Sequence, residues 1–530
     1  MDSKRHYVYP FAPFLFVWDL ATGRTTWNLV WIGIWSHLFA GAFAAFGAQI
    51  SWHQSYPSLL EKVVLTTLQT GAGFLVGLLM WGALFTVIAA IFGGLPGPVS
   101  PSVIRGSRFK NDDEISSWNK SAKSGNPIWL GKCAIHPDKE PQHFLVAGRT
   151  GAGKTQVIYS FLEKARERAQ AGIAADLSGI YLSRFYRDGD TVLSLFDRRS
   201  VAWSPFNEIR APYDAMLLAE SFIPRADDGS DDKQWQFYAQ TLLGELLRSL
   251  HAKGDHSMAH MRRLMMSATA AELQVFTKDT AVEILCHAGN ERMLANTRAI
   301  AAVYMNPWQY LPDNGHFSIR SWVANNADGS DWLFLPYRDD QASLVRNLLA
   351  GWIDLAVTEA LRLPEDPGRR FWYLMDELDS LGKLGSLKAA TTKLRKYGGV
   401  VVGGIQTVSQ LEATYGEKTA QTILGSLSNK IILAAGDGAT ATYFETELGK
   451  QTAWVSSHAE GSSSSFGQAP SSSYTSTRSE TERSTVMASQ LLSLPDLTGY
   501  LRLTGDNITP FALTYKNHPF KVTAFEDIHA

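Results

Sequence analysis

The sequence predicts an α/β fold with an inserted all-α subdomain and two transmembrane helices at its N-terminus. Three observations lead to this prediction. A glycine-rich stretch lies between an apolar run and a helix-like segment, as in a turn that links a parallel strand to a helix. A long region with helical periodicity separates this stretch from further strand-like segments. Two long segments near the N-terminus contain no acidic residue, lysine or arginine.

The N-terminal region, residues 1–100, contains the two segments that we expect to cross a membrane. No Asp, Glu, Lys or Arg occurs from Trp27 to Leu60 or from Val63 to Ile104. A helix needs about 20 apolar residues to cross a bilayer, and each segment supplies them, roughly at 27–48 and 65–92. Basic residues lie before the first span and after the second, so the positive-inside rule places both termini in the cytoplasm. A buried helical hairpin is the alternative. The basic residues are Lys4, Arg5, Arg24, Arg105, Arg108 and Lys110.

The composition is that of a globular protein. The chain has 530 residues, more than a single hydrophobic core usually supports, so we expect more than one domain. The formal net charge is only −2. A protein that binds nucleic acid through its overall charge is usually basic, so any contact with nucleic acid must be local here. Cys133 and Cys286 are the only cysteines, which argues against a disulfide framework or a cysteine metal site.

The stretch GRTGAGKT has the spacing of a phosphate-binding loop. Its glycines permit the backbone angles that let N–H groups approach phosphate oxygens closely. Lys154 would reach the terminal phosphates of a nucleoside triphosphate, and the Thr155 hydroxyl would hold Mg²⁺. We therefore predict ATP and Mg²⁺ as ligands, against the alternative of a glycine-rich turn that matches by chance. The predicted nucleotide-binding residues are Gly148, Arg149, Thr150, Gly151, Ala152, Gly153, Lys154 and Thr155.

Two carboxylates follow an aromatic and aliphatic strand predicted at 371–375. Asp376 would hold Mg²⁺ through water, together with Thr155, and Glu377 would polarise the water that attacks the γ-phosphate. An Asp-Glu pair alone often marks only the start of a helix. Because this pair follows a strand in a chain that already has a phosphate-binding loop, we interpret it as catalytic.

The next predicted strand, at 399–405, is followed by Gln406. RecA-like motors keep a side chain that senses the γ-phosphate at this place, so we predict a RecA-like domain with Gln406 as its sensor. A helix-capping role is the alternative. The cations at 392–396 could form a solvated helix face or supply an arginine finger to a neighbouring subunit. Arg395 is the candidate finger.

The chain between Lys154 and Asp376 is longer than the strands of a compact α/β core require. Much of it has helix spacing, and strand character returns at 331–336. We predict a membrane anchor at 1–100, the first part of the nucleotide-binding domain at 101–211, the all-helical insertion at 212–312, and the second part of the nucleotide-binding domain at 313–530.

Residues 456–484 are rich in serine and contain few large apolar side chains. Such a composition buries too little surface to offset the entropy of ordering the chain. We therefore expect a mobile loop here and assign it no function.

Six motifs run through the region that follows the predicted membrane spans: GRTGAGKT, FNEIR (206–210), FSIRSW (317–322), WYLMDELDSLGKL (372–384), GGIQTVSQL (403–411) and SLPDLTGYL (493–501). As a set, and in this order, they resemble the type IV coupling proteins, in particular the TrwB- and TraD-like members of conjugative plasmids. The likeness covers nearly the whole region after the spans. One departure is Asp176-Leu177-Ser178-Gly179, where the family often has Asp-Pro-x-Gly.

This resemblance implies a membrane-anchored, ring-forming and hexameric ATPase of the bacterial inner membrane. Such a protein links relaxase-bound DNA to the channel proteins of a type IV secretion system. It pumps single-stranded DNA through the channel, largely without regard to sequence. The residues carried over are Lys154 and Thr155 for nucleotide and Mg²⁺, Asp376 and Glu377 as the acidic pair, Gln406 as the sensor and Arg395 as the arginine that acts in trans.

Three other functions stay open on the sequence alone. The first is a secretion ATPase that exports effector proteins, and the second is an FtsK-like translocase of double-stranded DNA. The third is a membrane scaffold that holds a nucleotide as a structural ligand. Glu377 argues against the scaffold, because a scaffold has no need for a carboxylate that activates water.

Overall fold

Residues Val103–Ala530 form one compact unit. The two predicted membrane spans, at 27–48 and 65–92, lie outside the part of the chain that the structure describes. Within that part, no helix combines the length and the apolar character that a bilayer crossing requires. The computed structural model describes residues 103–224, 233–313, 315–463 and 471–528.

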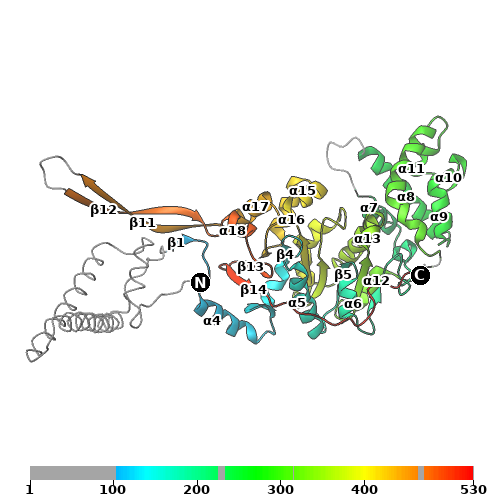
Figure 1. Ribbon diagram of the computed structural model, residues 1–530. Helices are drawn as coiled ribbons and strands as arrows, with labels where there is room; N and C mark the ends of the chain where they lie inside the picture. Colours follow the sequence, from blue (N-terminus) through cyan, green and yellow to red (C-terminus); the bar gives the residue numbers. More distant parts are fainter. Residues whose placement is uncertain (1–102, 225–232, 314, 464–470, 529–530) are drawn as a thin grey trace, which may run out of the picture. The chain divides into compact units, whose positions relative to one another are not determined.

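A nine-stranded sheet lies at the centre of this unit (Figure 1). Its strands are β4 (Phe144–Ala147), β5 (Gly172–Leu177), β6 (Thr191–Val192), β7 (Trp332–Tyr337), β8 (Phe371–Met375), β9 (Gly399–Ile405), β10 (Asn429–Ile432), β13 (Thr498–Arg502) and β14 (Thr509–Ala512). In space their order is β14-β13-β10-β4-β9-β8-β5-β7-β6. All neighbours from β10 to β6 are parallel, and β13 and β14 add an antiparallel edge.

Helices cover both faces of the sheet, so the central strands β4, β8 and β9 are buried at every residue. Successive residues of β4 alternate between two apolar clusters. Phe144 joins the cluster of Phe161, with ring centroids 4.7 Å apart, whereas Leu145 joins the cluster of Ile423. The helices outside the insertion are α4 (Asp112–Lys123), α5 (Lys154–Glu167), α6 (Ile180–Phe185), α12 (Ile319–Asn326), α13 (Asp339–Ala360), α14 (Leu387–Lys393), α15 (Val408–Tyr415), α16 (Glu417–Ser426), α17 (Gly438–Leu448) and α18 (Ala488–Leu492), with 3₁₀ turns η1 (Pro137–Gln142), η2 (Pro205–Glu208) and η5 (Leu394–Tyr397).

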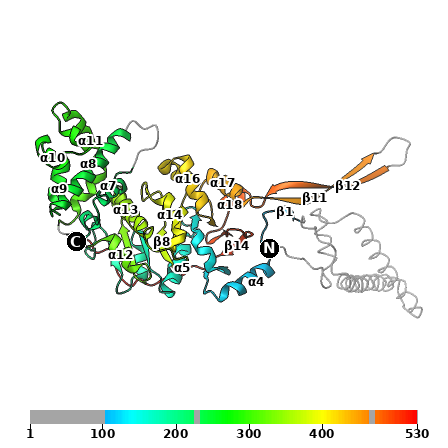
Figure 2. The same ribbon diagram turned by 180° about the vertical axis from the view of Figure 1, so that it is seen from behind.

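The region predicted as a helical insertion is helical, and its described residues contain no strand. Its first helix packs against α13 and against the long second helix, which also contacts the last α-helix of the region. Figures 1 and 2 show these helices, in green, as a group beside the sheet. They are α7 (Asp214–Phe222), α8 (Lys233–Ala252), α9 (Met258–Met266), α10 (Ala270–Thr277), η3 (Glu283–Cys286), α11 (Glu291–Met305) and η4 (Asn306–Tyr310).

Buried polar contacts join the FNEIR and FSIRSW motifs to each other. The Glu208 carboxylate accepts hydrogen bonds from Trp203 Nε1 at 2.8 Å and from the backbone N–H of Ile319, at the first turn of α12, at 2.6 Å. Arg320 in turn donates to Asp214, at the start of α7, at 2.6 Å. A carboxylate at a helix N-terminus is favoured by the free N–H groups there. These two motifs therefore fasten α7 and α12 to each other and have a structural role.

The described residues of the serine-rich segment, 456–463 and 471–484, form the two paired strands of a β-hairpin, so the prediction of a mobile loop was wrong for these residues. Strands β11 (Lys450–Ser463) and β12 (Ser471–Ser484) are each 14 residues long and pair antiparallel throughout, and β1 (Val103–Gly106) adds a third strand beside β11. The prediction considered only the apolar surface that side chains could bury. A ladder of backbone hydrogen bonds does not depend on that surface, and threonine and tyrosine favour strands.

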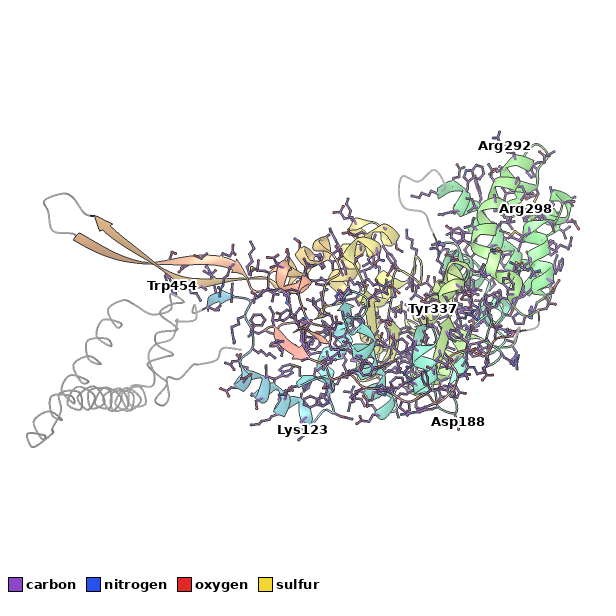
Figure 3. The ribbon with its side chains drawn as sticks, in the orientation of Figure 1. Lys123, Asp188, Arg292, Arg298, Tyr337 and Trp454 are labelled. Carbon is purple, nitrogen blue, oxygen red and sulfur yellow. The ribbon has the colours of Figure 1, made fainter. Side chains whose placement is uncertain are left out.

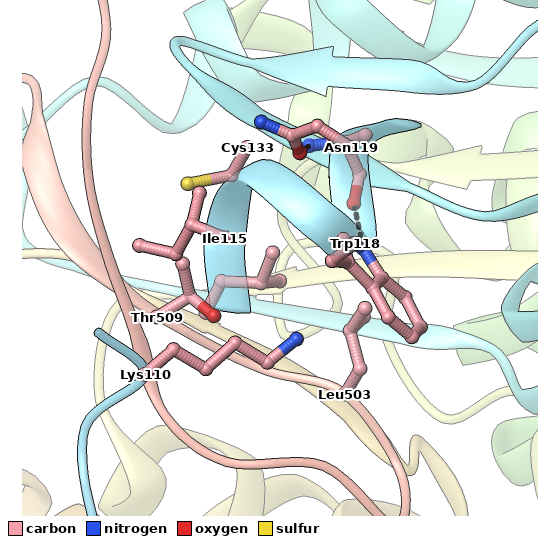
Figure 4. A pocket seen from close by; sticks show the side chains of 9 residues that line it. Lys110, Ile115, Trp118, Asn119, Cys133, Leu503 and Thr509 are labelled. Atoms are coloured by element: carbon pink, nitrogen blue, oxygen red, sulfur yellow. Dashed lines mark hydrogen bonds between the residues drawn. The ribbon is translucent and has the colours of Figure 1, made fainter. Parts of the chain in front are cut away.

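The chain between β1 and β4 adds a small antiparallel pair, β2 (Ile128–Leu130) and β3 (Cys133–Ile135). Helix α4 packs against β3. Trp118 Nε1 donates to Ala134 O at 2.7 Å, and Lys110 Nζ lies 4.1 Å from the centre of the Trp118 ring (Figure 4). Lys110 also forms an ion pair with Asp506, next to β14. These contacts fasten the segment that leads in from residue 103 to the antiparallel edge of the sheet.

The C-terminal segment, in red in Figure 1, extends along α5 and α6. The amide of Gln156 exchanges two hydrogen bonds with the backbone of Lys516, at 2.9 and 3.2 Å. Further along, Lys521 N–H donates to Ser183 O at 2.7 Å. Asp527 forms an ion pair with Arg338, just before α13. The segment therefore links the helix after the glycine-rich loop to the start of α13.

Candidate nucleotide-binding site

The phosphate-binding loop connects β4 to α5 and is anchored on β9 and on the residues just after β10. The Gly148 N–H donates to Ile405 O at 3.2 Å, and the Arg149 N–H donates to Ala434 O at 2.8 Å. Gly153 has φ of 112°, a value that side-chain-bearing residues rarely adopt. A Cβ at Gly153 would also lie 2.8 Å from a methyl group of Leu497. Glycine is thus required here for the loop to reach α5.

Lys154 and Thr155 are the first two residues of α5, as the motif predicts. Lys154 Nζ donates to Gly148 O at 2.8 Å, so the ammonium lies back over the loop. Burial lowers the pKa of Lys154, while the carboxylates of Asp376 and Glu377 act in the opposite direction. The loop therefore holds a half-buried cation at the helix N-terminus that an anionic ligand would stabilise.

The acidic pair follows β8 at the carboxyl edge of the sheet, between β5 and β9. The backbone of Asp376 passes so close to Gly404 that a Cβ there would lie 1.7 Å from Asp376 O. Burial raises the pKa of Asp376, and a hydrogen bond from Tyr181 OH to Oδ2, at 2.6 Å, opposes this rise. Burial also raises the pKa of Glu377, and Asp379 raises it further.

Gln406 lies between the phosphate-binding loop and the acidic pair. Thr150 Oγ1 donates to Gln406 Oε1 at 3.2 Å, and Gln406 Nε2 donates to Glu377 Oε1. The following helix, α15, is capped by Thr407, which accepts the N–H of Gln410 at 3.2 Å. The capping alternative for Gln406 is therefore wrong.

Arg395 does not join these residues. It is exposed on η5, which precedes β9, whereas Gln406 follows β9. Burial lowers the pKa of His143, which precedes β4 at the same amino-terminal edge of the sheet, and the charge of Arg395 lowers it further. At about 3.3 Å per residue, the length of β9 puts roughly 20 Å between the two edges. Arg395 is thus out of reach of the site in its own subunit.

Three further residues contact or lie beside the site although no prediction from the sequence placed them there: Tyr181, Asp379 and Asp176. Asp379 stands three residues after Asp376, so its closeness to the acidic pair in the sequence could have marked it as a residue of the site. Asp176, at the end of β5, is fully buried and accepts the backbone N–H groups of Tyr181 and Leu182 at 3.0 and 2.6 Å. Burial raises the pKa of Asp176 to about 7. No pattern in the sequence predicts the role of Tyr181, because its contact with Asp376 depends on β5 and β8 being neighbours in the sheet.

A second tyrosine holds the backbone after the acidic pair. Tyr337, the last residue of β7 (labelled in Figure 3), shares a hydrogen bond of 2.8 Å with Ser380 Oγ. Ser380 Oγ also donates to Glu377 O at 2.9 Å. The turn that carries Glu377 is therefore fixed at both its side chain and its backbone.

The residues present fit Mg²⁺. Asp376 Oδ1 and Asp379 Oδ1 are buried, and neither has a hydrogen-bond partner among the residues that the structure describes. Mg²⁺ takes oxygen ligands and is usually bound by one or two carboxylates together with water and substrate phosphates. Asp376 and the hydroxyl of Thr155 are the groups that would hold it here.

Comparison with known proteins places this geometry in a family. A family profile described as "Type IV secretion-system coupling protein DNA-binding domain" matches residues 127–514. The coupling protein TraD of Escherichia coli (strain K12) is 27% identical over 447 residues, which cover 82% of this chain and 61% of TraD. This chain thus spans 61% of the length of that relative. Protein VirD4 of Rhizobium rhizogenes is 34% identical over 80 residues, or 15% of this chain and 12% of VirD4.

Solved structures agree with this result. The bacterial conjugative coupling protein TrwBdeltaN70, in an unbound form, superimposes with a TM-score of 0.72 at 31% identity. The match covers 82% of this chain and 99% of that one. The plasmid coupling protein TrwB in complex with ADP and Mg²⁺ gives a TM-score of 0.71 at 31% identity, over 82% of this chain and all of that one, 100%. The profile covers well over half of the sequence, so the chain belongs to the type IV secretion-system coupling proteins.

Proposed function

We propose that this chain binds ATP and Mg²⁺ and couples the hydrolysis of ATP to the transfer of single-stranded DNA in conjugation. The observation that carries the proposal is the hydrogen-bonded line from Thr150 through Gln406 to Glu377. It connects the loop that would hold the phosphates to the acid that would activate water. A scaffold that kept a nucleotide only as a structural ligand would have no use for this connection.

The positions of these groups support hydrolysis of the bound nucleotide. The phosphates of ATP would accept N–H groups of the loop, and Lys154 would turn from Gly148 O to the terminal phosphates. Mg²⁺, when bound, neutralises charge that develops on the phosphates. Glu377 would polarise the attacking water, and its raised pKa brings it closer to the neutral range in which a general base works best. After the γ-phosphate has left, a change in the position of the loop would be passed to Glu377 through the hydrogen bonds of Gln406.

The position of Arg395 supports a ring. Because it lies at the opposite edge of the sheet from Gln406, Arg395 can serve only the site of another subunit. A head-to-tail ring brings the two edges of neighbouring subunits together. We propose a homo-hexamer in which Arg395 stabilises the charge of the transition state in the adjacent site.

The proposed setting is the bacterial inner membrane. The charge-free segments at 27–48 and 65–92 would anchor the ring, with both termini and the ATPase domain in the cytoplasm. The relatives TraD and TrwB are named as coupling proteins, which supports relaxase-bound DNA and the type IV secretion channel as partners. A pore that follows a phosphate backbone needs only local positive charge, in keeping with the net charge of −2.

The test is ATP hydrolysis by the full-length chain in detergent or lipid nanodiscs, with and without single-stranded DNA. We expect stimulation by DNA, and we expect Glu377→Gln to abolish it while nucleotide binding remains. Stimulation by double-stranded DNA alone would instead favour an FtsK-like translocase. Hydrolysis by assembled rings that DNA does not alter would contradict DNA pumping and favour the export of effector proteins.

A further inference from the structure

The two oxygens of the Asp376 carboxylate have different surroundings. Oδ2 accepts the hydroxyl of Tyr181 at 2.6 Å. Oδ1 is buried and has no hydrogen-bond partner among the described residues. The carboxylate therefore has one oxygen committed to the protein and one left for a ligand.

Tyr181 is itself held firmly in place. Its side chain is 1% exposed, and its ring meets that of Tyr159 edge to face, with centroids 5.8 Å apart. Its backbone N–H, in the first turn of α6, donates to the fully buried Asp176 near the end of β5. The hydroxyl thus approaches Asp376 from the start of α6, which follows β5, the strand beside β8.

A carboxylate without such a contact rotates easily about its last side-chain bond, for which the preferences are broad. A hydrogen bond to one oxygen fixes that rotation. Groups that bond to a metal-binding carboxylate from behind commonly matter for metal affinity, by about 10- to 100-fold. The contact between Tyr181 and Asp376 has the geometry of such a group.

We propose that Tyr181 is a positioning residue for the magnesium site: its hydroxyl occupies Oδ2 of Asp376 and so presents Oδ1 to the hydrated ion. This inference rests on the proposed function, since it requires Mg²⁺ and nucleotide at this site. It assigns the magnesium affinity of the chain in part to a residue of α6, outside the loop and the acidic pair. Removing the hydroxyl leaves Asp376 in place but frees its carboxylate to turn.

The test compares Tyr181→Phe with Tyr159→Phe in the full-length chain. Tyr159 belongs to the same aromatic cluster, on α5, so its variant controls for the loss of a buried hydroxyl near the site. The measurement is the binding of a fluorescent ADP analogue, first in EDTA and then along a titration with Mg²⁺. Binding in EDTA reports the phosphate-binding loop, and the titration reports the metal.

We expect Tyr181→Phe to bind the analogue in EDTA as the wild type does and to need roughly tenfold more Mg²⁺ to reach half of the magnesium-dependent change. Tyr159→Phe should need the same Mg²⁺ concentration as the wild type. Equal Mg²⁺ requirements for all three proteins would overturn the role of Tyr181 and leave the proposed function standing. A wild type that binds no nucleotide, with or without Mg²⁺, would overturn the proposed function itself.

Discussion

Three carboxylates and one ammonium share the site, and burial raises the pKa of Asp376, Glu377 and Asp379 alike. Lys154 is the cation whose charge opposes this rise in each of them. A neutral amide suits the position of Gln406, because it can donate to a carboxylate and accept from a hydroxyl without adding charge. The side chain therefore joins the loop to Glu377 without adding charge to the site.

Replacing Gln406 by alanine should separate hydrolysis from binding. We expect Gln406→Ala to lower the rate of ATP hydrolysis by about 10- to 100-fold, because Glu377 loses the donor that orients it. Nucleotide affinity should change by less than about threefold, because the loop and Lys154 remain intact. Gln410→Ala, on the exposed first turn of α15, removes the same kind of side chain and should leave both quantities unchanged. Steady-state rates and equilibrium binding would show whether the two effects separate.

Asp354, away from the nucleotide site, gives the fold a pH dependence. It is buried on α13 and accepts the backbone N–H groups of Gly385 and Ser386, both at 2.9 Å. Burial raises its pKa to about 6, above the value of about 3.9 expected in the unfolded chain. Between about pH 4 and pH 6 the folded chain therefore holds a proton that the unfolded chain has released, so stability falls as pH rises through this window.

The substitution Asp354→Asn removes this titration. Relative to the variant, the wild type should lose on the order of 2 kcal/mol of unfolding free energy between about pH 4 and pH 7. Apparent melting temperatures of both proteins across this range would measure it. If the melting temperatures of the wild type and the variant change with pH in the same way, Asp354 has the same pKa in the folded and the unfolded chain, and this prediction is wrong.

At the scale of elements, the packing of α7 against α13 depends on the absence of one side chain. A Cβ at Gly351, in the middle of α13, would lie 2.1 Å from the ring of Phe222 on α7. Phe222 also meets Trp308 edge to face, with centroids 5.1 Å apart, so the ring has little room to move. The insertion is thus held to the sheet by a close contact between two helices.

We therefore expect Gly351→Ala to destabilise the chain by about 1 to 3 kcal/mol, the usual cost of overpacking a core. Gly425→Ala is the matched control, since Gly425 lies on α16 and its Cβ would meet nothing within 4 Å. That control should be neutral or stabilising by up to about 1 kcal/mol, because alanine favours helix. In denaturant or thermal unfolding, the midpoint of Gly351→Ala should fall below that of the wild type, whereas the midpoint of Gly425→Ala should stay equal or rise.

The elements that the sequence predicted well are those with local signals. The strand ending at Ala147, the strand at 371–375 and the strand before Gln406 could be predicted because each is an apolar run followed by a polar motif. Parallel strands end at the same edge of a sheet, so the residues after them had to meet. The contact of Tyr181 with Asp376 could not be predicted, because it depends on which strands are neighbours. The hairpin was missed because backbone pairing leaves no apolar pattern in the sequence.

At the scale of the whole molecule, the proposed arginine finger lies outside the nucleotide site of its own subunit. Lys154, Glu377 and Gln406 meet at the carboxyl edge of the sheet, while Arg395 lies exposed at the amino edge. In the proposed ring, neighbouring subunits would be coupled, because the cation that completes one site would belong to the next subunit. The proposed ring therefore predicts that two inactive variants can complement each other.

Co-expression of Arg395→Ala with Glu377→Gln provides the test. Each variant alone should be inactive, since one lacks the arginine and the other lacks the acid at every site. In a mixed ring, an Arg395→Ala subunit keeps its Glu377 and can receive Arg395 from a Glu377→Gln neighbour. A site works when its own subunit is Arg395→Ala and the neighbour that supplies the arginine is Glu377→Gln. If the two variants are present in equal amounts and mix at random, about a quarter of the sites meet this condition.

Lys154→Ala mixed with Glu377→Gln is the control for this experiment. Both of these residues act in their own subunit, so no arrangement of the two variants builds a complete site. ATP hydrolysis by purified mixed rings, isolated through a different tag on each variant, should recover for the first pair and stay absent for the second. Absence of recovery in the first pair would mean that Arg395 does not act across the interface, and its position would then give no support to a ring.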